Sequence, residues 1–181
     1  MSSIRFVAEV TVIGSWTLVK LPKSASAKLP SRGMAIVEGT LNGLHIQVAL
    51  EPDGKGGHWF SVDSSMLKTA KAKVGKTVEL DIEPSRDCPE PKVPADLKRA
   101  LGDDAEVQQQ WSAITPLARW DWIRWIRATS QPETRRRRIE VACSKLKDGE
   151  RRPCCFNRNQ CTEPEVSKNG VLLETTGGGT V

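Results

Sequence analysis

The sequence predicts an α+β protein in which a small β-barrel with internal pseudo-twofold symmetry precedes a helical module. A pseudo-repeat in the first half of the chain, together with strand-like alternation of apolar and polar residues, predicts the barrel. A change to helical periodicity after a proline-rich segment predicts the helical module.

The pseudo-repeat appears as two echoes of one pattern. Gly14 and Gly57 each begin the motif Gly-x-Trp-x-x-Val, 43 residues apart, and Gly33 and Gly75 each precede a further strand, 42 residues apart. Each half therefore runs strand, strand, short crossover, strand. The expected crossovers are residues 21–29 and 64–73. Two such halves predict a closed or nearly closed barrel, which removes exposed strand edges.

Alternating residues support the individual strands. Apolar and polar residues alternate from residue 4 to residue 10. Between the halves, one set of apolar residues alternates with His45, Gln47 and Ala49, which predicts a strand with one buried face. That set is Leu44, Ile46, Val48 and Leu50. We assign residues 1–90 to the barrel.

Four prolines within residues 84–94 mark the end of the barrel, because proline disfavours regular structure. Helical spacing follows at residues 96–100 and 104–114. Thr115 and Pro116 form an N-cap and first helical position for a helix to about residue 128, and a last helix follows Pro132 and ends at Gly149. We assign residues 91–150 to the helical module and residues 151–181 to a cysteine-containing extension with a flexible, glycine-rich tail.

Four consecutive arginines, Arg135 to Arg138, resemble a nucleic-acid patch at first sight. Consecutive residues turn by about 100° on a helix, so the four side chains fan around it. Arg137 is expected to point to solvent, and Arg135 to fall in the apolar stripe with Ile139. An inward guanidinium needs a partner. We expect an acid or carbonyl on the other side of the proline-rich segment, with an anion pocket and a nucleic-acid patch as alternatives.

A ligand site is expected in a cleft between the barrel and the helices. Its candidate residues are Arg135, His58, Trp120 and Arg138. His58 shares strand parity with Phe60, which places it at the inner rim of the barrel, and Trp120 falls away from the apolar side of its helix, where it could stack with Arg124. No complete catalytic motif or phosphate loop occurs, so we expect a protein that is not an enzyme and needs no cofactor.

The cysteines offer a weaker candidate site. Cys143, Cys154, Cys155 and Cys161 could hold zinc, yet they lack Cys-x-x-Cys spacing and both histidines lie in the barrel. Arginines beside Cys154 and Cys155 would favour thiolate, so redox sensing is a further alternative. We expect inert, reduced thiols.

Composition limits the cellular compartment and the classes of partner that we expect. The net charge is +5, and acidic residues are mixed with the basic ones throughout, so the balance suits solubility as well as binding. Five cysteines, an odd number, fit a reducing compartment, and no signal peptide or membrane span is expected. We therefore expect a cytoplasmic protein.

Two groups of motifs carry a resemblance to known families. The first group is Gly-Thr-Leu-Asn-Gly at 39–43, the strand at 57–62 and the segment 74–80; the second is residues 93–97, Trp122-Ile123 and residues 134–139. The first resembles a bacterial domain of unknown function with a double-split β-barrel. The second is similar to a bacteriocin-protection or OmpD-associated (YdeI-like) module. The resemblance implies a barrel related to swapped-hairpin transcription factors and antitoxins, formed within one chain, and no established activity.

These observations predict a non-enzymatic cytoplasmic binding or accessory protein, connected with stress or bacteriocin protection, whose partner is an unidentified small ligand or protein. A nucleic-acid-binding regulator that uses the barrel is the first alternative, and a thiol redox or zinc protein that uses the C-terminal cysteines is the second. The sequence does not define the oligomeric state.

Overall fold

The structure, a computed structural model, describes residues 2–175, which separate into two compact units. Of the described chain, the first unit contains residues 2–87, 158–161 and 166–175, and the second contains residues 88–157 and 162–165. Residues 151–175 are thus divided between the units. The end of the predicted glycine-rich tail, residues 176–181, lies outside the described residues.

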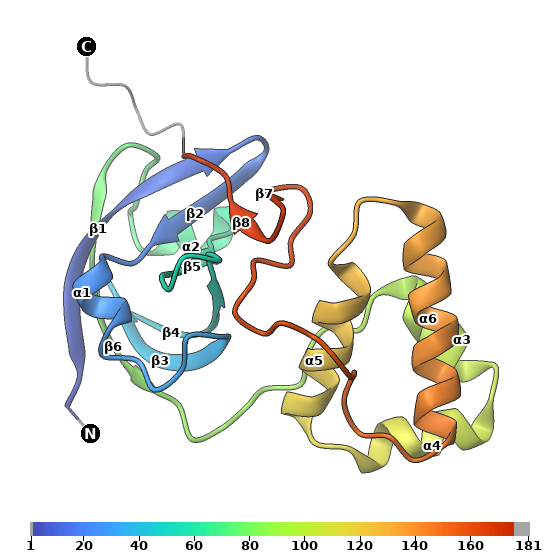
Figure 1. Cartoon of the computed structure of the whole chain (residues 1–181). Helices are drawn as coiled ribbons and strands as arrows, with labels where there is room; N and C mark the ends of the chain where they lie inside the picture. Colours follow the sequence, from blue (N-terminus) through green and yellow to red (C-terminus); the bar gives the residue numbers. More distant parts are fainter. Residues whose placement is uncertain (1, 176–181) are drawn as a thin grey trace. The chain divides into compact units, whose positions relative to one another are not determined.

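Six strands of the first unit close into an antiparallel barrel in the order β1-β2-β5-β4-β3-β6 (Figure 1). The strands are β1 Ile4–Ile13, β2 Trp16–Lys20, β3 Ala35–Leu41, β4 Leu44–Pro52, β5 His58–Ser61 and β6 Thr77–Pro84. Two short helices, α1 (Lys23–Ser26) and α2 (Ser64–Thr69), form the crossovers. The predicted repeat is confirmed, since β1-β2-α1-β3 corresponds to β4-β5-α2-β6, and the pairing of β1 with β2 corresponds to that of β4 with β5.

Because apolar and polar residues alternate along the strands, every second side chain points into the barrel. On β6, Val78, Leu80 and Ile82 are buried, while the intervening side chains point outward. Inward residues from all six strands form one apolar core, which contains Ile4, Val10, Val19, Val37, Leu41, Ile46, Leu50, Phe60, Val78, Leu80 and Ile82. Because every strand is paired on both sides, the barrel has no free edge.

Two positions explain how β3 fits between its neighbours. Asn42 and Gly43 join β3 to β4 with φ angles of 47° and 83°, the left-handed values that a two-residue hairpin turn needs. Gly39 lies against β6, where an added Cβ would be 2.0 Å from the Asp81 carbonyl oxygen. A side chain at Gly39 would therefore force the two strands apart.

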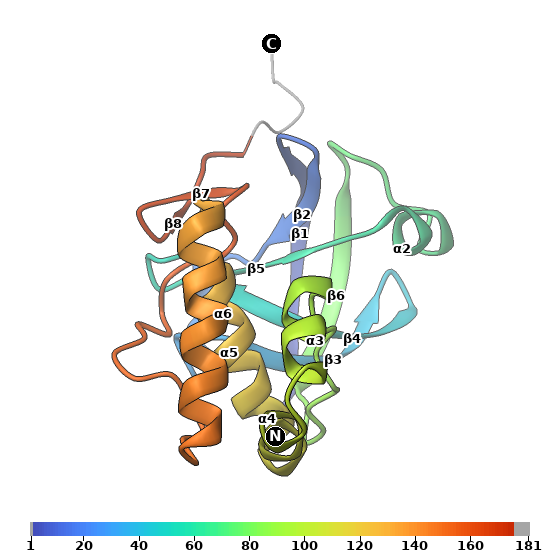
Figure 2. The same cartoon turned by 90° about the vertical axis from the view of Figure 1, so that its right-hand side faces the viewer.

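Four helices form the second unit: α3 Ala95–Gly102, α4 Ala105–Ala113, α5 Pro116–Arg127 and α6 Pro132–Lys147. The predicted N-cap is confirmed, because the Thr115 hydroxyl accepts a hydrogen bond from the Ala118 amide at 3.2 Å. Helix α6 packs against α3, α4 and α5 (Figure 2). Its predicted apolar stripe is buried: Ile139, Ala142 and Leu146 are at most 7% exposed, and Cys143 packs against them.

The C-terminal segment returns to the outer surface of the barrel. Strands β7 (Ser167–Lys168) and β8 (Val171–Leu172) pair as a small hairpin. Cys161, Val166 and Leu172 are buried with Trp59 and other outward residues of β1 and β2, and the Leu172 amide donates to the Asp53 carbonyl at 2.9 Å. A second, external apolar cluster therefore joins this segment to the barrel unit.

Candidate functional site

His58 lies inside the barrel, with no exposed surface. Its Nε2 is 2.9 Å from the Gly33 carbonyl oxygen, which can only accept, so Nε2 carries the proton and Nδ1 is the bare nitrogen of the neutral ring. Nδ1 is buried without a hydrogen-bond partner among the described residues. Burial lowers the pKa of His58, because a charged ring would carry a second, unsatisfied N–H. The side chain is suited to hold the Gly33 turn in place.

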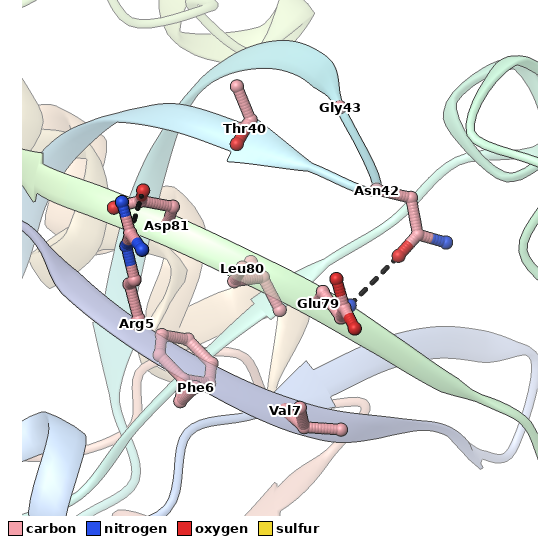
Figure 3. A pocket seen from close by; sticks show the side chains of 9 residues that line it. All are labelled: Arg5, Phe6, Val7, Thr40, Asn42, Gly43, Glu79, Leu80 and Asp81. Carbon is pink, nitrogen blue, oxygen red and sulfur yellow. Dashed lines mark hydrogen bonds and ion pairs between the residues drawn. The ribbon is translucent and has the colours of Figure 1, made fainter.

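A groove of about 530 Å³ runs over the outer face of β1, β6 and the β3–β4 turn (Figure 3). Phe6 and Leu80 underlie it, with their side chains packed in the barrel core, and Val7, which is 54% exposed, gives it an apolar wall. Polar groups complete the lining at Arg5, Thr40, Asn42, Gly43, Glu79 and Asp81. The groove thus combines apolar surface with carboxylates, an arrangement typical of ligand sites.

Asp81 is the central charged residue of this groove. Its Oδ2 accepts a hydrogen bond from Arg5 Nε at 3.0 Å (Figure 3). Its Oδ1 is buried and accepts no hydrogen bond from the described residues. A buried carboxylate oxygen without a donor is costly, so Asp81 would gain from a further donor once Oδ1 becomes accessible. Arg5 itself is 80% exposed and can move away.

Asn42 fixes the other end of the groove. Its Oδ1 accepts from the Glu79 amide at 2.8 Å (Figure 3), and its Nδ2 donates to the Ala70 carbonyl at 3.2 Å. These bonds fasten the β3–β4 turn to β6 and to the end of α2. The groove is therefore built on ordered backbone, which a specific binding site requires.

A second hollow of about 350 Å³ shares Thr40 and Asp81 with the groove and extends over the neighbouring part of β3 and β6. It adds Glu38, His45 and Glu83 to this surface. Glu38 and Glu83 lie directly opposite each other in the β3–β6 register, a pairing of like charges that destabilises a sheet. We call the combined surface of the two hollows the acidic groove.

Most of the guanidinium groups in the arginine run of α6 are paired with neighbouring groups. Arg135 forms a bidentate pair with Asp96 of α3, with Nε–Oδ2 and Nη2–Oδ1 distances of 2.7 and 3.0 Å. Arg136 pairs with Glu133 and with Glu140 on its own helix. Arg137 is exposed, as the helical projection predicts. The inward arginine therefore has an acidic partner as expected, but this partner lies on α3 of the same unit and not across the proline-rich segment.

Arg135 also lines a hollow of about 370 Å³ between α3 and α6, where Arg99 and Asp103 add charge. The hydrogen bond from Arg135 lowers the pKa of Asp96, which keeps that carboxylate ionised and the guanidinium occupied. An anion would have to displace Asp96 to use the same donors.

The other predicted ligand residues of the helical unit also have protein partners. Trp120 is half-buried and donates from Nε1 to the Pro89 carbonyl at 3.2 Å. Arg138 donates to the Trp125 carbonyl at 2.7 Å and lies over the Trp125 ring. The cation–π contact of Arg124 is with Phe156, 5.3 Å from the ring centroid. Arg135, Trp120 and Arg138 belong to one unit and His58 to the other, so their common cleft stays a prediction.

The cysteines are dispersed over the two units. Cys161 is buried in the barrel unit, whereas Cys143 lies half-buried on α6 and Cys154 and Cys155 are exposed. Burial raises the pKa of Cys143. Among the described residues, no group of three or more histidine, cysteine, aspartate or glutamate side chains is placed to hold a metal ion. Cys154 and Cys155 are in contact, with their sulfurs 2.9 Å apart.

Sequence reasoning did not identify the acidic groove. Its outward residues are polar and alternate with core residues, the ordinary pattern of a solvated strand face. The available signal was the exposed Val7 among charged neighbours, together with the acidic residues that recur along β6.

Two family models match consecutive parts of the chain. Residues 6–82 match DUF1905, a domain of unknown function, and residues 90–149 match OmdA, described as bacteriocin-protection, YdeI or OmpD-associated. No curated protein gives a significant match. In the part of the chain that the structure describes, no helix has both the length and the apolar character needed to cross a membrane. The chain thus carries a DUF1905 match over most of the barrel, followed by an OmdA match over the four helices.

Proposed function

We propose that this protein is a non-enzymatic binding protein whose acidic groove takes a lysine or arginine side chain of a partner protein. The observation that carries the proposal is the buried Oδ1 of Asp81, which has no donor among the described residues although it lies in a groove of about 530 Å³. A cationic N–H group supplies both the missing hydrogen bond and the opposite charge.

The shape of the lining favours these side chains over a small inorganic cation. Lysine and arginine combine an apolar stem with a charged head. Val7 offers exposed apolar contact for the stem, while Asp81 and Glu79 offer acceptors for the head. The outward side chains of β1, β6 and β3 carry five carboxylates, at Glu9, Glu38, Glu79, Asp81 and Glu83, and a single cation at Arg5, so the electrostatic potential attracts a basic segment.

We also propose a cellular role and a location for the protein. An accessory role in bacteriocin protection or stress is supported by the description of the family that residues 90–149 match. Residence in the cytoplasm is supported by the odd number of five cysteines, which suits a reducing compartment. A small ligand in the predicted cleft near His58 and Arg135 is a less favoured alternative, because both side chains already have partners.

Fluorescence anisotropy with a labelled peptide of alternating arginine and glycine tests the proposal. The same peptide with citrulline in place of arginine keeps the shape and removes the charge. We expect the arginine peptide to bind in a salt-dependent manner and the citrulline peptide to bind at least about tenfold more weakly, a difference of about 1.4 kcal/mol.

Two substitutions give opposite expected results. Asp81→Asn removes the charged acceptor and should weaken binding about tenfold or more, whereas Arg5→Ala removes a competing cation and should strengthen it. Asp103→Asn makes the same chemical change in the hollow of the helical unit and is the matched control. Equal affinity of Asp81→Asn and the unmodified protein, or weaker binding by Arg5→Ala, would show that the groove is not the site.

A further inference from the structure

A pair of adjacent thiols outside the barrel forms a second candidate site. Cys154 and Cys155 are both exposed, and their sulfurs are 2.9 Å apart. Cys155 has a φ of 59°, a left-handed value that is uncommon for residues other than glycine, asparagine or aspartate. This backbone conformation accompanies two neighbouring sulfurs that face each other, where an extended chain would point them apart.

The loop that carries the thiols is fastened on both sides to α5. Before the pair, the Trp122 indole donates to the Arg151 carbonyl at 2.9 Å, and Arg152 pairs with Asp121 at 3.1 Å. After the pair, the Phe156 ring lies under the guanidinium of Arg124. The two sulfurs are therefore held together before any ligand arrives, which lowers the entropic cost of binding to both.

The geometry selects among ligands for two thiols. Structural zinc requires four ligands in a tetrahedron with Zn–S bonds of about 2.3 Å, which would separate two sulfurs by about 3.8 Å. The described residues provide no third ligand near the pair. A pyramidal trivalent centre needs only two protein sulfurs side by side and keeps its third bond for its own substituent.

The raised pKa of Cys154 argues against a peroxide sensor. The hydrogen bond with Cys155 and the closeness of its sulfur raise the pKa of Cys154. Redox-sensor cysteines have the opposite property, since the thiolate is the form that peroxide oxidises. A chelated ligand, by contrast, gains its stability from binding both sulfurs at once.

We propose that Cys154 and Cys155 form a bidentate site for trivalent arsenic species. In the reaction, two S–H bonds and two As–OH bonds break, two As–S bonds form, and two molecules of water leave. Arsenic stays trivalent, so no oxidant or reductant takes part. The site is separate from the acidic groove and does not depend on it.

Intact-protein mass spectrometry after incubation with phenylarsine oxide tests the site. We expect one phenylarsenic adduct per chain and the loss of two maleimide-reactive thiols, because Cys154 and Cys155 are the exposed pair. The dithiol 2,3-dimercaptopropanol should remove the adduct, whereas an equal concentration of 2-mercaptoethanol should not. Cys154→Ser and Cys155→Ser should each weaken binding about 100-fold or more, because only one sulfur is left.

Two further variants separate this site from other causes. Cys143→Ser, which removes a half-buried thiol on α6, should bind as the unmodified protein does. Arg152→Gln keeps both thiols but frees the loop from Asp121, and it should weaken binding several-fold. Retention of the adduct by either Cys154→Ser or Cys155→Ser would overturn the proposal. The proposal would also be overturned if the protein bound no arsenical but lost two hydrogens, the mass change of disulfide formation, when treated with hydrogen peroxide.

Discussion

Replacement of Arg135 by alanine tests whether the arginine run stabilises the fold. The bidentate pair between Arg135 and Asp96 joins α6 to α3, and its two side chains are 28% and 42% exposed. Exposure to this degree lets water screen the charges, so the pair is worth much less than a buried one. Ideal two-bond geometry places it near the upper end of the surface range, about 1 kcal/mol.

Urea unfolding of Arg135→Ala, Asp96→Asn and the double variant measures this contribution as a coupling energy. Arg137→Ala is the matched control, since it removes an exposed arginine two residues away on the same helix. We expect no measurable change for Arg137→Ala and a coupling of about 1 kcal/mol between Arg135 and Asp96. Equal unfolding midpoints for Arg135→Ala and Arg137→Ala would refute the structural role and favour the anion pocket.

The coupling should depend on pH in a defined direction. Arg135 lowers the pKa of Asp96 in the folded protein, so the folded state binds its proton less readily than the unfolded state does. The stabilisation is then fully present above the ordinary aspartate pKa of about 3.9, and it is lost as the pH falls through the lower folded value. A coupling energy that did not decline in this acidic range would contradict the assignment of Asp96 as the partner.

Three further predictions concern the barrel unit. Gly39→Ala should lower the unfolding midpoint strongly or prevent folding, because its Cβ would meet the Asp81 carbonyl. Burial lowers the pKa of His58, so part of the stability should be lost as the pH falls below about 6.5, and His58→Gln should lose that dependence while His45→Gln keeps it. Leu172→Ala should cost about 2–5 kcal/mol in urea unfolding, whereas its exposed neighbour Leu173→Ala should cost little.

The sequence was most informative where local rules determine structure. The repeated Gly-x-Trp-x-x-Val motif predicted two equivalent strand units, and their antiparallel pairing closes the barrel as expected. Caps and prolines likewise predicted the ends of α5 and α6, because they act within one helical turn. The need of Arg135 for a partner also followed from helical projection alone.

Features that depend on packing between distant segments were not predictable. The partner of Arg135 is Asp96, 39 residues away, and only the packing of α3 on α6 brings them together. The covering of Trp59 by the C-terminal segment required knowledge of which outward face that segment would meet. Trp16 and Leu18 on the neighbouring strand indicated that some segment packs there, since apolar residues on an outward face are usually buried by another part of the protein.

The charge distribution bears on the nucleic-acid alternative. Topological relatives of this barrel suggested DNA binding, but fold does not determine function. The arginine run of α6 is largely occupied by acids and a carbonyl, and the outer face of β1, β6 and β3 carries mainly carboxylates. One basic segment of the barrel unit is the exposed set Lys68, Lys71, Lys73 and Lys76, in α2 and between it and β6.

Retention on nonspecific DNA at low salt decides this alternative. A surface that neutralises several phosphates loses affinity steeply as salt rises, with a slope set by the number of contacts. We expect no salt-dependent retention between about 50 and 200 mM salt, because four lysines without paired arginines or stacking aromatics provide few positioned contacts. If the chain is retained and a variant with these four lysines changed to glutamine is not, the barrel binds nucleic acid through α2. The acidic groove would then lie beside that contact, because its residue Asn42 donates to the Ala70 carbonyl at the end of α2.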